Sequence, residues 1–135
     1  MKRDLRQVLA GHGIRPSAHR LAVAEYILET EEHPSADRVW HAVAESFPAI
    51  SRATVYNTLH LFVEKGLLRE VHLDPERVVF DPKLETHHHF IDETTGTIYD
   101  VPWEKVQVRN LDSLRGYRIR DYQVVMRGTR RRPKA

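Results

Sequence analysis

The sequence predicts an α+β protein in two parts, a helical N-terminal part and a smaller C-terminal part rich in strands. Apolar residues recur at helical spacing through the first half of the chain, and after Gly66 the period changes to one typical of strands. The segment DPK, residues 81–83, resembles a linker between the two parts. We therefore expect one domain over residues 1–82 and a second over residues 83–135.

The composition is that of a soluble globular protein. Of 135 residues, 41% are hydrophobic and 30% are charged, and the net charge of +2 does not by itself demand a nucleic-acid partner. No apolar run approaches the roughly 20 residues of a membrane helix, and the N-terminus lacks the apolar segment of a secretory signal. A cytoplasmic protein without a membrane partner is expected. Because the chain has no cysteine, it has no disulfides or thiolate metal sites.

Four helices are predicted in the N-terminal part. The first covers RDLRQVLAGHG and stops at one of its two glycines, and the next two follow the capping residues Ser17 and Ser35. The fourth starts at Ser51 and ends at Gly66. The segments LLREVHL and RVVFD then flank the turn-forming DPE and predict a β-hairpin. Helices followed by such a hairpin form the pattern of a winged helix-turn-helix domain.

The C-terminal part is predicted to contain strands and one short helix. We expect strands at residues 87–91, 97–101 and 117–127, and a helix within 102–112. About fifty residues of this kind cannot bury much of a core alone. We therefore expect a symmetric homodimer in which two copies pair the sheets of a small α/β dimerisation domain.

The helix that starts at Ser51 is a candidate for binding DNA. Its apolar stripe should face the core and includes Val55, Leu59, Phe62 and Val63. Side chains suited to base or phosphate contacts lie on or beside the opposite face; they are Arg52, Thr54, Tyr56 and Asn57. An ordinary amphipathic helix has the same periodicity, and winged helices also serve as protein-interaction modules, so both alternatives stay open here.

Three consecutive histidines, His87, His88 and His89, begin the first C-terminal strand. Side chains alternate between the two faces of a strand, so His87 and His89 point one way and His88 points the other. A His-x-His pair on one strand is a common two-ligand platform for a metal, since imidazole suits Fe, Zn, Mn, Ni and Cu. A solvated cluster of surface histidines is the alternative.

Three further residues can join such a metal site. Asp100 closes the hairpin that begins with the histidines, and Asp81 lies six residues before His87. His33 differs from the other scattered histidines because it lies in a loop just ahead of a helix, where a ligand can project.

Taken together, these motifs resemble the ferric uptake regulator family. The segments HPSADRVW, SRATVYNTLHLFVEKGLL, FDPKLETHHHF and GTIYD occur in the family's order and spacing, and the likeness covers nearly the whole chain. The resemblance implies a dimeric, metal-responsive transcription regulator with a winged helix and an α/β dimerisation domain. It would be a cytoplasmic repressor, not an enzyme, and would bind a pseudo-palindromic operator in double-stranded DNA.

The resemblance also implies a regulatory metal site at the hinge between the domains. Carried over residue by residue, its ligands match His33, Asp81, His87, His89 and Asp100. A set of three His and two Asp is similar to the peroxide-responsive (PerR) branch, in which bound Fe²⁺ reacts with hydrogen peroxide and a ligating histidine is oxidised. His33 or His87 would be the target here. The expected cofactor is one Fe²⁺ or Mn²⁺ per subunit, with Zn²⁺ possible in crystals.

Some positions depart from the family. Most members hold a structural zinc with two Cys-x-x-Cys pairs, which would fall at Asp92 and Thr95 and in the basic tail, so no structural zinc held by four cysteines is expected. The family's T-x-Q-R appears as SAHR, which leaves Arg20 and Arg15, a possible minor-groove residue, as DNA contacts. Cysteine-free relatives with HHH include the haem-responsive Irr regulators. An Irr-like haem- or iron-responsive regulator is therefore one alternative, and a small metalloenzyme with a His/Asp site is another.

Overall fold

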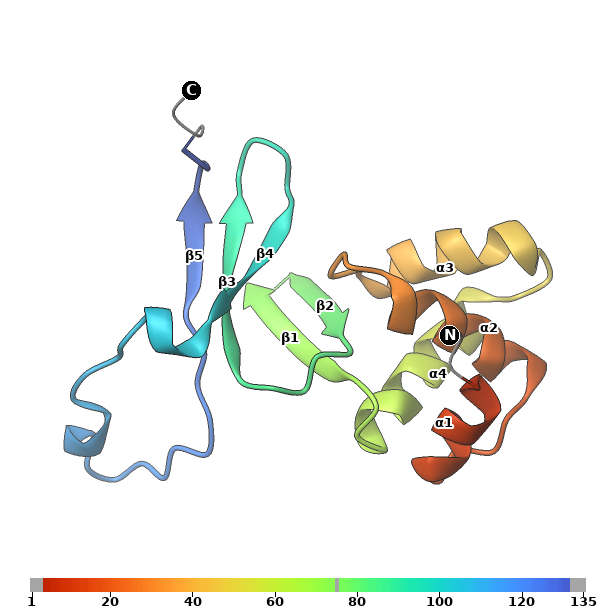
Figure 1. Ribbon diagram of the computed structural model, residues 1–135, viewed down its shortest axis with the longest axis horizontal. Coiled ribbons are helices and arrows are strands. Elements are labelled where there is room, and N and C mark those ends of the chain that lie inside the picture. The colour runs from red at the N-terminus through yellow and green to blue at the C-terminus, as the bar shows by residue number, and fades with distance from the viewer. Residues whose placement is uncertain (1–3, 75, 132–135) are drawn as a thin grey trace. The chain divides into compact units, whose positions relative to one another are not determined.

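The computed structural model describes residues 4–74 and 76–131, and the chain divides into two compact units, one up to Leu84 and one from Glu85 onward (Figure 1). Within the described residues, the first unit contains four α-helices and a two-stranded sheet, and the second contains a three-stranded sheet. The predicted α+β class is confirmed.

Each helix of the first unit begins after a side chain that accepts a backbone N–H. The caps are Asp4, Ser17, Ser35 and Ser51, so the two predicted serine caps, Ser17 and Ser35, are confirmed, and Ser51, where the fourth helix was expected to start, is the cap of that helix. Gly66, at a φ of 80°, turns the chain after the last helix into the first strand. The helices are α1 (Leu5–Gly11), α2 (Ala18–Glu29), α3 (Ala36–Ser46) and α4 (Arg52–Glu64).

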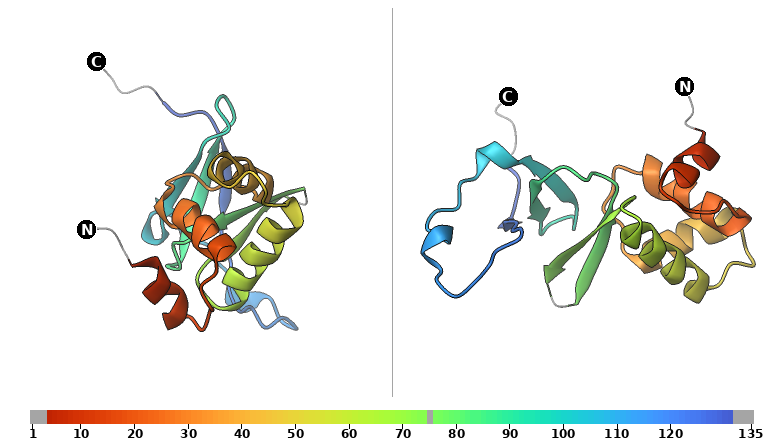
Figure 2. Two further views of the ribbon diagram at one scale, coloured as in Figure 1. Left: turned by 90° about the vertical axis from the view of Figure 1, so that its right-hand side faces the viewer. Right: turned by 90° about the horizontal axis from the view of Figure 1, so that it is seen from below.

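The core of the first unit fixes which face of α4 is turned outward. Figure 2 shows α4 among the other helices of the first unit. Val55, Leu59 and Phe62 are 0% exposed and pack with apolar side chains of the other three helices. Val63 is partly buried against the same cluster. Burying each of these side chains contributes about 1.5–3 kcal/mol, so α4 cannot rotate without a large loss of stability. Tyr56 on the outer face is 42% exposed as a result.

The sheet of the first unit is the predicted hairpin. Strands β1 (Arg69–Asp74) and β2 (Arg77–Asp81) are antiparallel. The predicted DPE turn includes Pro75, which lies outside the described residues. The N–H of Phe80 donates to the carbonyl oxygen of Pro34 over 2.9 Å. This bond ties the end of β2 to the segment that precedes α3.

In the second unit the sheet has the order β4-β3-β5, with β3 (His87–Asp92), β4 (Ile98–Pro102) and β5 (Val125–Gly128). Strands β3 and β4 form an antiparallel hairpin in which His89 pairs with Asp100. Strand β5 lies on the other side of β3 and runs parallel to it, with Val125 paired to His89. The first two predicted strands of the C-terminal part are therefore confirmed.

The segment between β4 and β5 differs from the prediction. The helix expected within 102–112 is wrong, because only two 3-10 turns form, at Trp103–Lys105 and Leu111–Ser113. Asn110 interrupts any continuous helix, since its φ of 69° is left-handed. The strand expected over 117–127 begins only at Val125. Figure 1 shows this segment as a loop that leaves the sheet after β4 and returns as β5.

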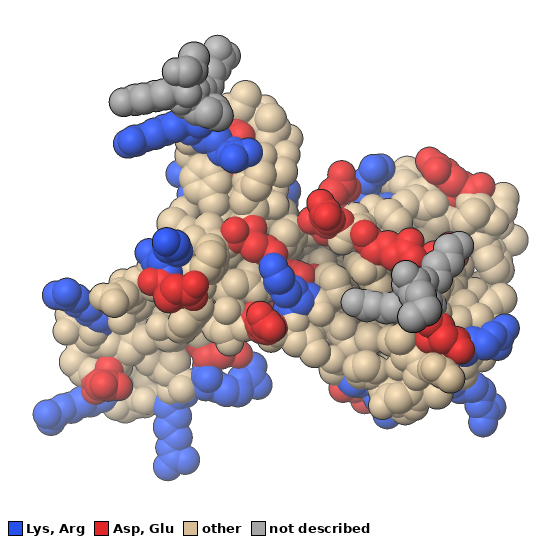
Figure 3. Space-filling view, viewed as in Figure 1, with Lys and Arg blue, Asp and Glu red and all other residues tan. Residues whose placement is uncertain are grey.

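Neither helix length nor bulk charge identifies a binding surface. No helix in the described part of the chain is long and apolar enough to cross a membrane. On the face shown in Figure 3, basic and acidic side chains are interspersed on both units. A functional site must therefore be located from particular side chains and their geometry.

Candidate metal centre

Three of the predicted metal ligands lie together in the second unit. His87 and His89 share one face of β3, and Asp100 on β4 is the cross-strand partner of His89. Asp100 Oδ1 is 3.3 Å from His87 Nε2 and 3.7 Å from His89 Nε2. One possible ligand atom from each of the three residues lies within 4.8 Å of the other two. We call these residues the three-ligand group.

Hydrogen bonds at the far side of both imidazoles turn their Nε2 atoms toward Asp100. His87 Nδ1 donates to the carbonyl oxygen of Glu85 over 2.6 Å, and His89 Nδ1 donates to Gln123 Oε1 over 3.0 Å. Because these oxygens can only accept, each Nδ1 carries a proton, and in its neutral form each imidazole presents a lone pair at Nε2. Two lone pairs and a carboxylate oxygen then face one point. Such an arrangement is repulsive by itself and is stabilised by a cation.

The other two predicted ligands lie together in the first unit. His33 Nε2 is 3.3 Å from Asp81 Oδ2. The other carboxylate oxygen of Asp81 accepts the backbone N–H of Lys83 over 2.9 Å, which fixes the side chain at the end of β2. The hydrogen bond from Phe80 to Pro34 brings the loop that carries His33 beside Asp81. We call His33 and Asp81 the two-ligand group.

The donor atoms fit a divalent first-row metal. Imidazole nitrogen and carboxylate oxygen without thiolate suit Fe²⁺, Mn²⁺ or Zn²⁺. A metal-bound histidine almost always donates its other ring N–H to an oxygen, and both His87 and His89 do so. His87 is 6% exposed and His89 is 2% exposed, so these histidines do not form a solvated cluster on the surface. Donor type and imidazole orientation both support a resident metal.

His88 points to the opposite face of β3 and has a different environment. Its Nδ1 accepts the backbone N–H of Val124 over 2.9 Å, so its proton is on Nε2. The ring stacks on Trp103, with centroids 4.4 Å apart and 14° between the planes. Since His88 is 0% exposed, it is part of the interior of the second unit rather than of the three-ligand group.

Four of the predicted DNA-binding residues surround one hollow on the first unit. Arg15, Arg20, Thr54 and Asn57 line a space of about 400 Å³. The Arg20 guanidinium donates to the carbonyl oxygen of Arg15 over 2.9 Å, and so steadies the loop between α1 and α2. Sequence reasoning did not include His19, which lines the same hollow.

The remaining two predicted DNA-binding residues, Arg52 and Tyr56, do not line this hollow. The Arg52 guanidinium lies 4.3 Å from the ring centroid of Trp40 and 3.6 Å from a carboxylate oxygen of Asp37. Tyr56 lines a second hollow with His60. Packing of α3 on α4 places Asp37 and Trp40 beside Arg52, and no local sequence pattern indicates that proximity.

Two residues that hold the metal-site histidines were also missed. Glu85 acts through its backbone oxygen, which any residue supplies, so its side chain gives no signal. Gln123 is 34 residues from His89 in the sequence, and only the return of the chain into β5 brings them together.

Comparisons with known proteins support a family assignment. A model of the ferric uptake regulator family matches residues 11–127. The peroxide-responsive repressor PerR of Staphylococcus aureus (strain Mu50 / ATCC 700699) is 34% identical over 94 residues, which are 70% of this chain and 64% of that protein. The match thus spans less than two thirds of this curated relative.

Two solved structures show the same fold. The ferric uptake regulator from Pseudomonas aeruginosa with manganese has a TM-score of 0.71 at 22% identity, over 96% of this chain and 100% of that one. A zinc-bound manganese uptake regulator has a TM-score of 0.69 at 23% identity, over 95% and 99% of the two chains.

Mn²⁺ is expected to stabilise the folded protein through the three-ligand group. At a free concentration of 100 times its Kd, a ligand of the native state adds about 2.7 kcal/mol to the free energy of unfolding. Asp100→Asn should remove most of this gain, because it deletes the negative charge that faces both Nε2 atoms. Denaturant titration with and without Mn²⁺ measures the effect. Glu93→Gln, an exposed change in the same unit, is the matched control. An equal gain in all three proteins would contradict the site.

Proposed function

Because this chain belongs to the ferric uptake regulator family, we propose that it is a metal-dependent, DNA-binding transcriptional repressor of the cytoplasm. The observation that carries the proposal is the three-ligand group, in which His87, His89 and Asp100 direct acceptor atoms at one point. The proposed cofactor is one Fe²⁺ or Mn²⁺ per subunit. The protein would act by binding and releasing DNA, not by turning over a substrate.

The two-ligand group is proposed to complete the coordination of the same cation. Two carboxylates would offset the charge of a divalent ion, and five ligands would leave room for one small exogenous ligand. Asp81 and His87 are six residues apart, so the chain between them spans at most about 20 Å. That short tether supports capture of one ion by both groups. The shared ion would hold the two units in one orientation.

Metal control of DNA binding follows from this arrangement. A cation that binds one orientation of the units better than others shifts the population toward it by its differential affinity. In a dimer, that orientation would set the two α4 helices to meet successive major grooves of a pseudo-palindromic operator. The guanidinium groups of Arg15 and Arg20 are suited to phosphates, and exposed Tyr56 is suited to a thymine methyl group.

We infer that the DNA-binding form is a homodimer built on the second unit. Among the described residues of that unit, Ile91 and Ile98 are the only apolar side chains that are buried. At the same time Leu114, Tyr117 and Ile119 are 48%, 75% and 43% exposed. A unit with so small a core and so much exposed apolar surface is expected to bury that surface against a second copy.

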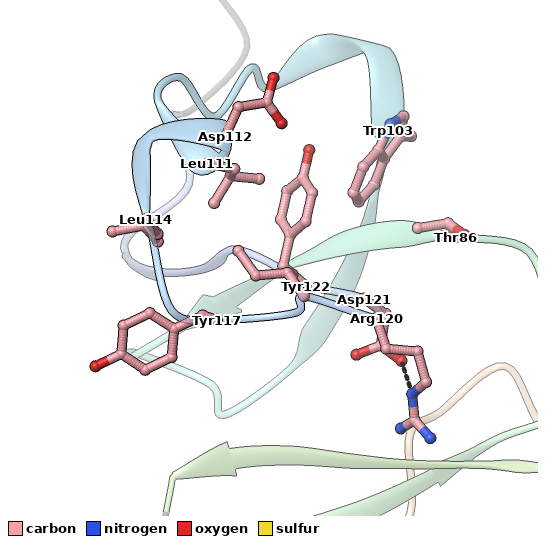
Figure 4. Close-up of a pocket in the computed structure, with 10 residues that line it drawn as sticks. Thr86, Trp103, Leu111, Asp112, Leu114, Tyr117, Arg120, Asp121 and Tyr122 are labelled. Atoms are coloured by element: carbon pink, nitrogen blue, oxygen red, sulfur yellow. Dashed lines mark ion pairs between the residues drawn. The ribbon is translucent and has the colours of Figure 1, made fainter.

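The exposed residues surround a pocket of about 530 Å³ beside the sheet, shown in Figure 4. Tyr122 points into the pocket between Leu111 and Trp103, whereas Tyr117 points away at the rim. The rim side chains are therefore available to a second copy without any change to the pocket interior.

The ligand set also supports a proposal of peroxide sensing. Bound Fe²⁺ would catalyse transfer of one oxygen atom from hydrogen peroxide to an imidazole carbon, with the second oxygen leaving as water. His33 or His87 is the proposed target. A damaged imidazole binds the cation less well, so the two units lose their common orientation and repression ends. Mn²⁺ would support repression without this response.

Operator binding should require both the cation and the outer face of α4. With double-stranded DNA selected from a random library in Mn²⁺, EDTA should abolish binding, and Tyr56→Ala or Asn57→Ala should weaken it about 10-fold or more. Mn²⁺ affinity should not change, since neither Tyr56 nor Asn57 is among the possible ligands. Fluorescence anisotropy and Mn²⁺ titration measure the two affinities. Glu64→Gln, exposed at the other end of α4, is the control; binding that is indifferent to EDTA would refute the proposal.

Charge placed on the pocket rim should disrupt the dimer. Tyr117→Glu buries a carboxylate in the proposed interface, at a cost that should convert dimer to monomer at micromolar concentration. Sedimentation equilibrium gives the dissociation constant. Lys105→Glu, an exposed change in the same segment with a larger change of charge, should leave the dimer intact. A monomeric unsubstituted protein, or an unchanged constant for Tyr117→Glu, would contradict the inference.

Iron and peroxide together should add one oxygen atom to the protein. Intact-mass analysis should show this gain with Fe²⁺ and hydrogen peroxide but not with Mn²⁺ and hydrogen peroxide, and peptide mapping should place it at His33 or His87. Equal gain with both metals, or none with iron, would remove peroxide sensing from the proposal. Haem absorption that appears on titration and is lost in His87→Ala would favour the Irr-like alternative instead.

A further inference from the structure

Gln123 is the side chain that holds His89 from outside the β3–β4 hairpin. It lies two residues before Val125, the residue of β5 that pairs with His89. Side chains two residues apart in an extended segment share a face, so Gln123 reaches the same face of the sheet as His89. Its Oε1 accepts the Nδ1 proton of His89 over 3.0 Å.

The backbone beside Gln123 is fixed on β3 by the next residue. The carbonyl oxygen of Val124 accepts the N–H of His89 over 3.1 Å, and the N–H of Val124 donates to His88 Nδ1 over 2.9 Å. Two hydrogen bonds from one residue therefore anchor the start of β5 to two consecutive histidines. The amide of Gln123 is left with little freedom to leave His89.

We propose that Gln123 is a positioning residue of the metal site, which selects the metal-ready tautomer of His89. The inference rests on the proposed metal site and deepens it. A neutral imidazole carries its proton on either Nδ1 or Nε2, and only the nitrogen without a proton binds a metal. Gln123 keeps the proton on Nδ1 and leaves the Nε2 lone pair directed at the position between His87 and Asp100.

The competing tautomer of His89, with the proton on Nε2, has an acceptor in the same hairpin. A proton on His89 Nε2 would face Asp100 Oδ1, 3.7 Å away, and a small shift would close a hydrogen bond between them. That bond would occupy both a nitrogen and an oxygen that the cation needs. His89 is 2% exposed, so without Gln123 the Nδ1 proton would lose its acceptor in the interior. Gln123 thus biases a two-state equilibrium toward the form that binds metal.

His87 provides an internal comparison. Its Nδ1 proton goes to the backbone oxygen of Glu85, and no side-chain substitution removes that acceptor. His89 is held by a side chain instead. A change at Gln123 should therefore alter the tautomer of His89 and leave that of His87 unchanged.

The chemistry of the acceptor predicts how substitutions rank. Gln123→Leu keeps a similar volume and removes the acceptor, and Gln123→Ser is too short to reach His89. Gln123→Glu keeps an acceptor and makes it a stronger one, because charged partners form the stronger hydrogen bonds. Gln107→Leu, an exposed change in the same unit, is the matched control.

The direct test reads the tautomer in the full-length, metal-free protein. Two-bond ¹H–¹⁵N correlation spectra at about pH 8, where an ordinary imidazole is neutral, distinguish the Nδ1–H and Nε2–H forms. We expect the Nδ1–H form for His89 in the unsubstituted protein and in Gln123→Glu. In Gln123→Leu and Gln123→Ser, His89 should shift toward the Nε2–H form while His87 does not. An unchanged His89 in both loss variants would overturn the inference.

The second test measures Mn²⁺ affinity by competition with a fluorescent chelator. Loss of a side chain that orients a ligand typically lowers metal affinity about 10–100-fold. We expect that loss in Gln123→Leu and Gln123→Ser, no more than about twofold change in Gln107→Leu, and no loss in Gln123→Glu. Circular dichroism checks that each variant is folded. Because leucine and serine differ in polarity, one loss variant can be used for the affinity measurement if the other does not fold.

The outcomes separate this inference from the proposed function. If the unsubstituted protein binds Mn²⁺ and both loss variants bind it equally well, the role of Gln123 is wrong and the repressor proposal stands. If the unsubstituted protein binds no Mn²⁺, the repressor proposal fails, and the tautomer spectra alone decide whether Gln123 selects the form of His89.

Discussion

The convergence of two imidazole Nε2 atoms and one carboxylate oxygen in the β3–β4 hairpin is the constraint around which the second unit is arranged. The described part of that unit buries only two apolar side chains, and much of its interior is taken by the three histidines instead. Buried polar groups are costly unless each is satisfied. The hairpin therefore depends on the two acceptors of the Nδ1 protons, the Glu85 carbonyl oxygen and Gln123 Oε1, and a cation at the proposed metal site would offset the acceptor atoms that face one another there. The hydrogen bonds that hold the hairpin are thus the same ones that orient the proposed metal ligands.

Three consecutive histidines serve two purposes because a strand has a period of two. His87 and His89 face Asp100 with their protons on Nδ1, while His88 faces the other side with its proton on Nε2. The first arrangement presents lone pairs to a cation. The second uses the Nδ1 lone pair to hold the start of β5 and uses the ring to stack on Trp103. One short strand thus carries ligands on one face and a structural anchor on the other.

Local signals explain what could be predicted from the sequence. Serine caps, helical apolar spacing and the His-x-His pair each act over a few residues, so the helices, both hairpins and the shared face of His87 and His89 were predicted. The prediction for the segment between β4 and β5 was wrong because the conformation of this segment depends on left-handed Asn110 and on strand pairing that starts only at Val125. Gln123 and the position of Arg52 over Trp40 were missed because contacts between distant segments create them.

Residues 122–124 connect the surface proposed for dimer formation with the residues proposed to hold the metal. Tyr122 lines the pocket beside Trp103, Gln123 bonds His89, and Val124 bonds both His88 and His89. A second copy that orders this segment would also order the acceptor that selects the metal-ready form of His89. Coupling between two binding events is reciprocal, so the metal must tighten the dimer by the same factor by which dimer formation tightens metal binding. Dimer formation and metal binding would thereby reinforce each other through residues 122–124.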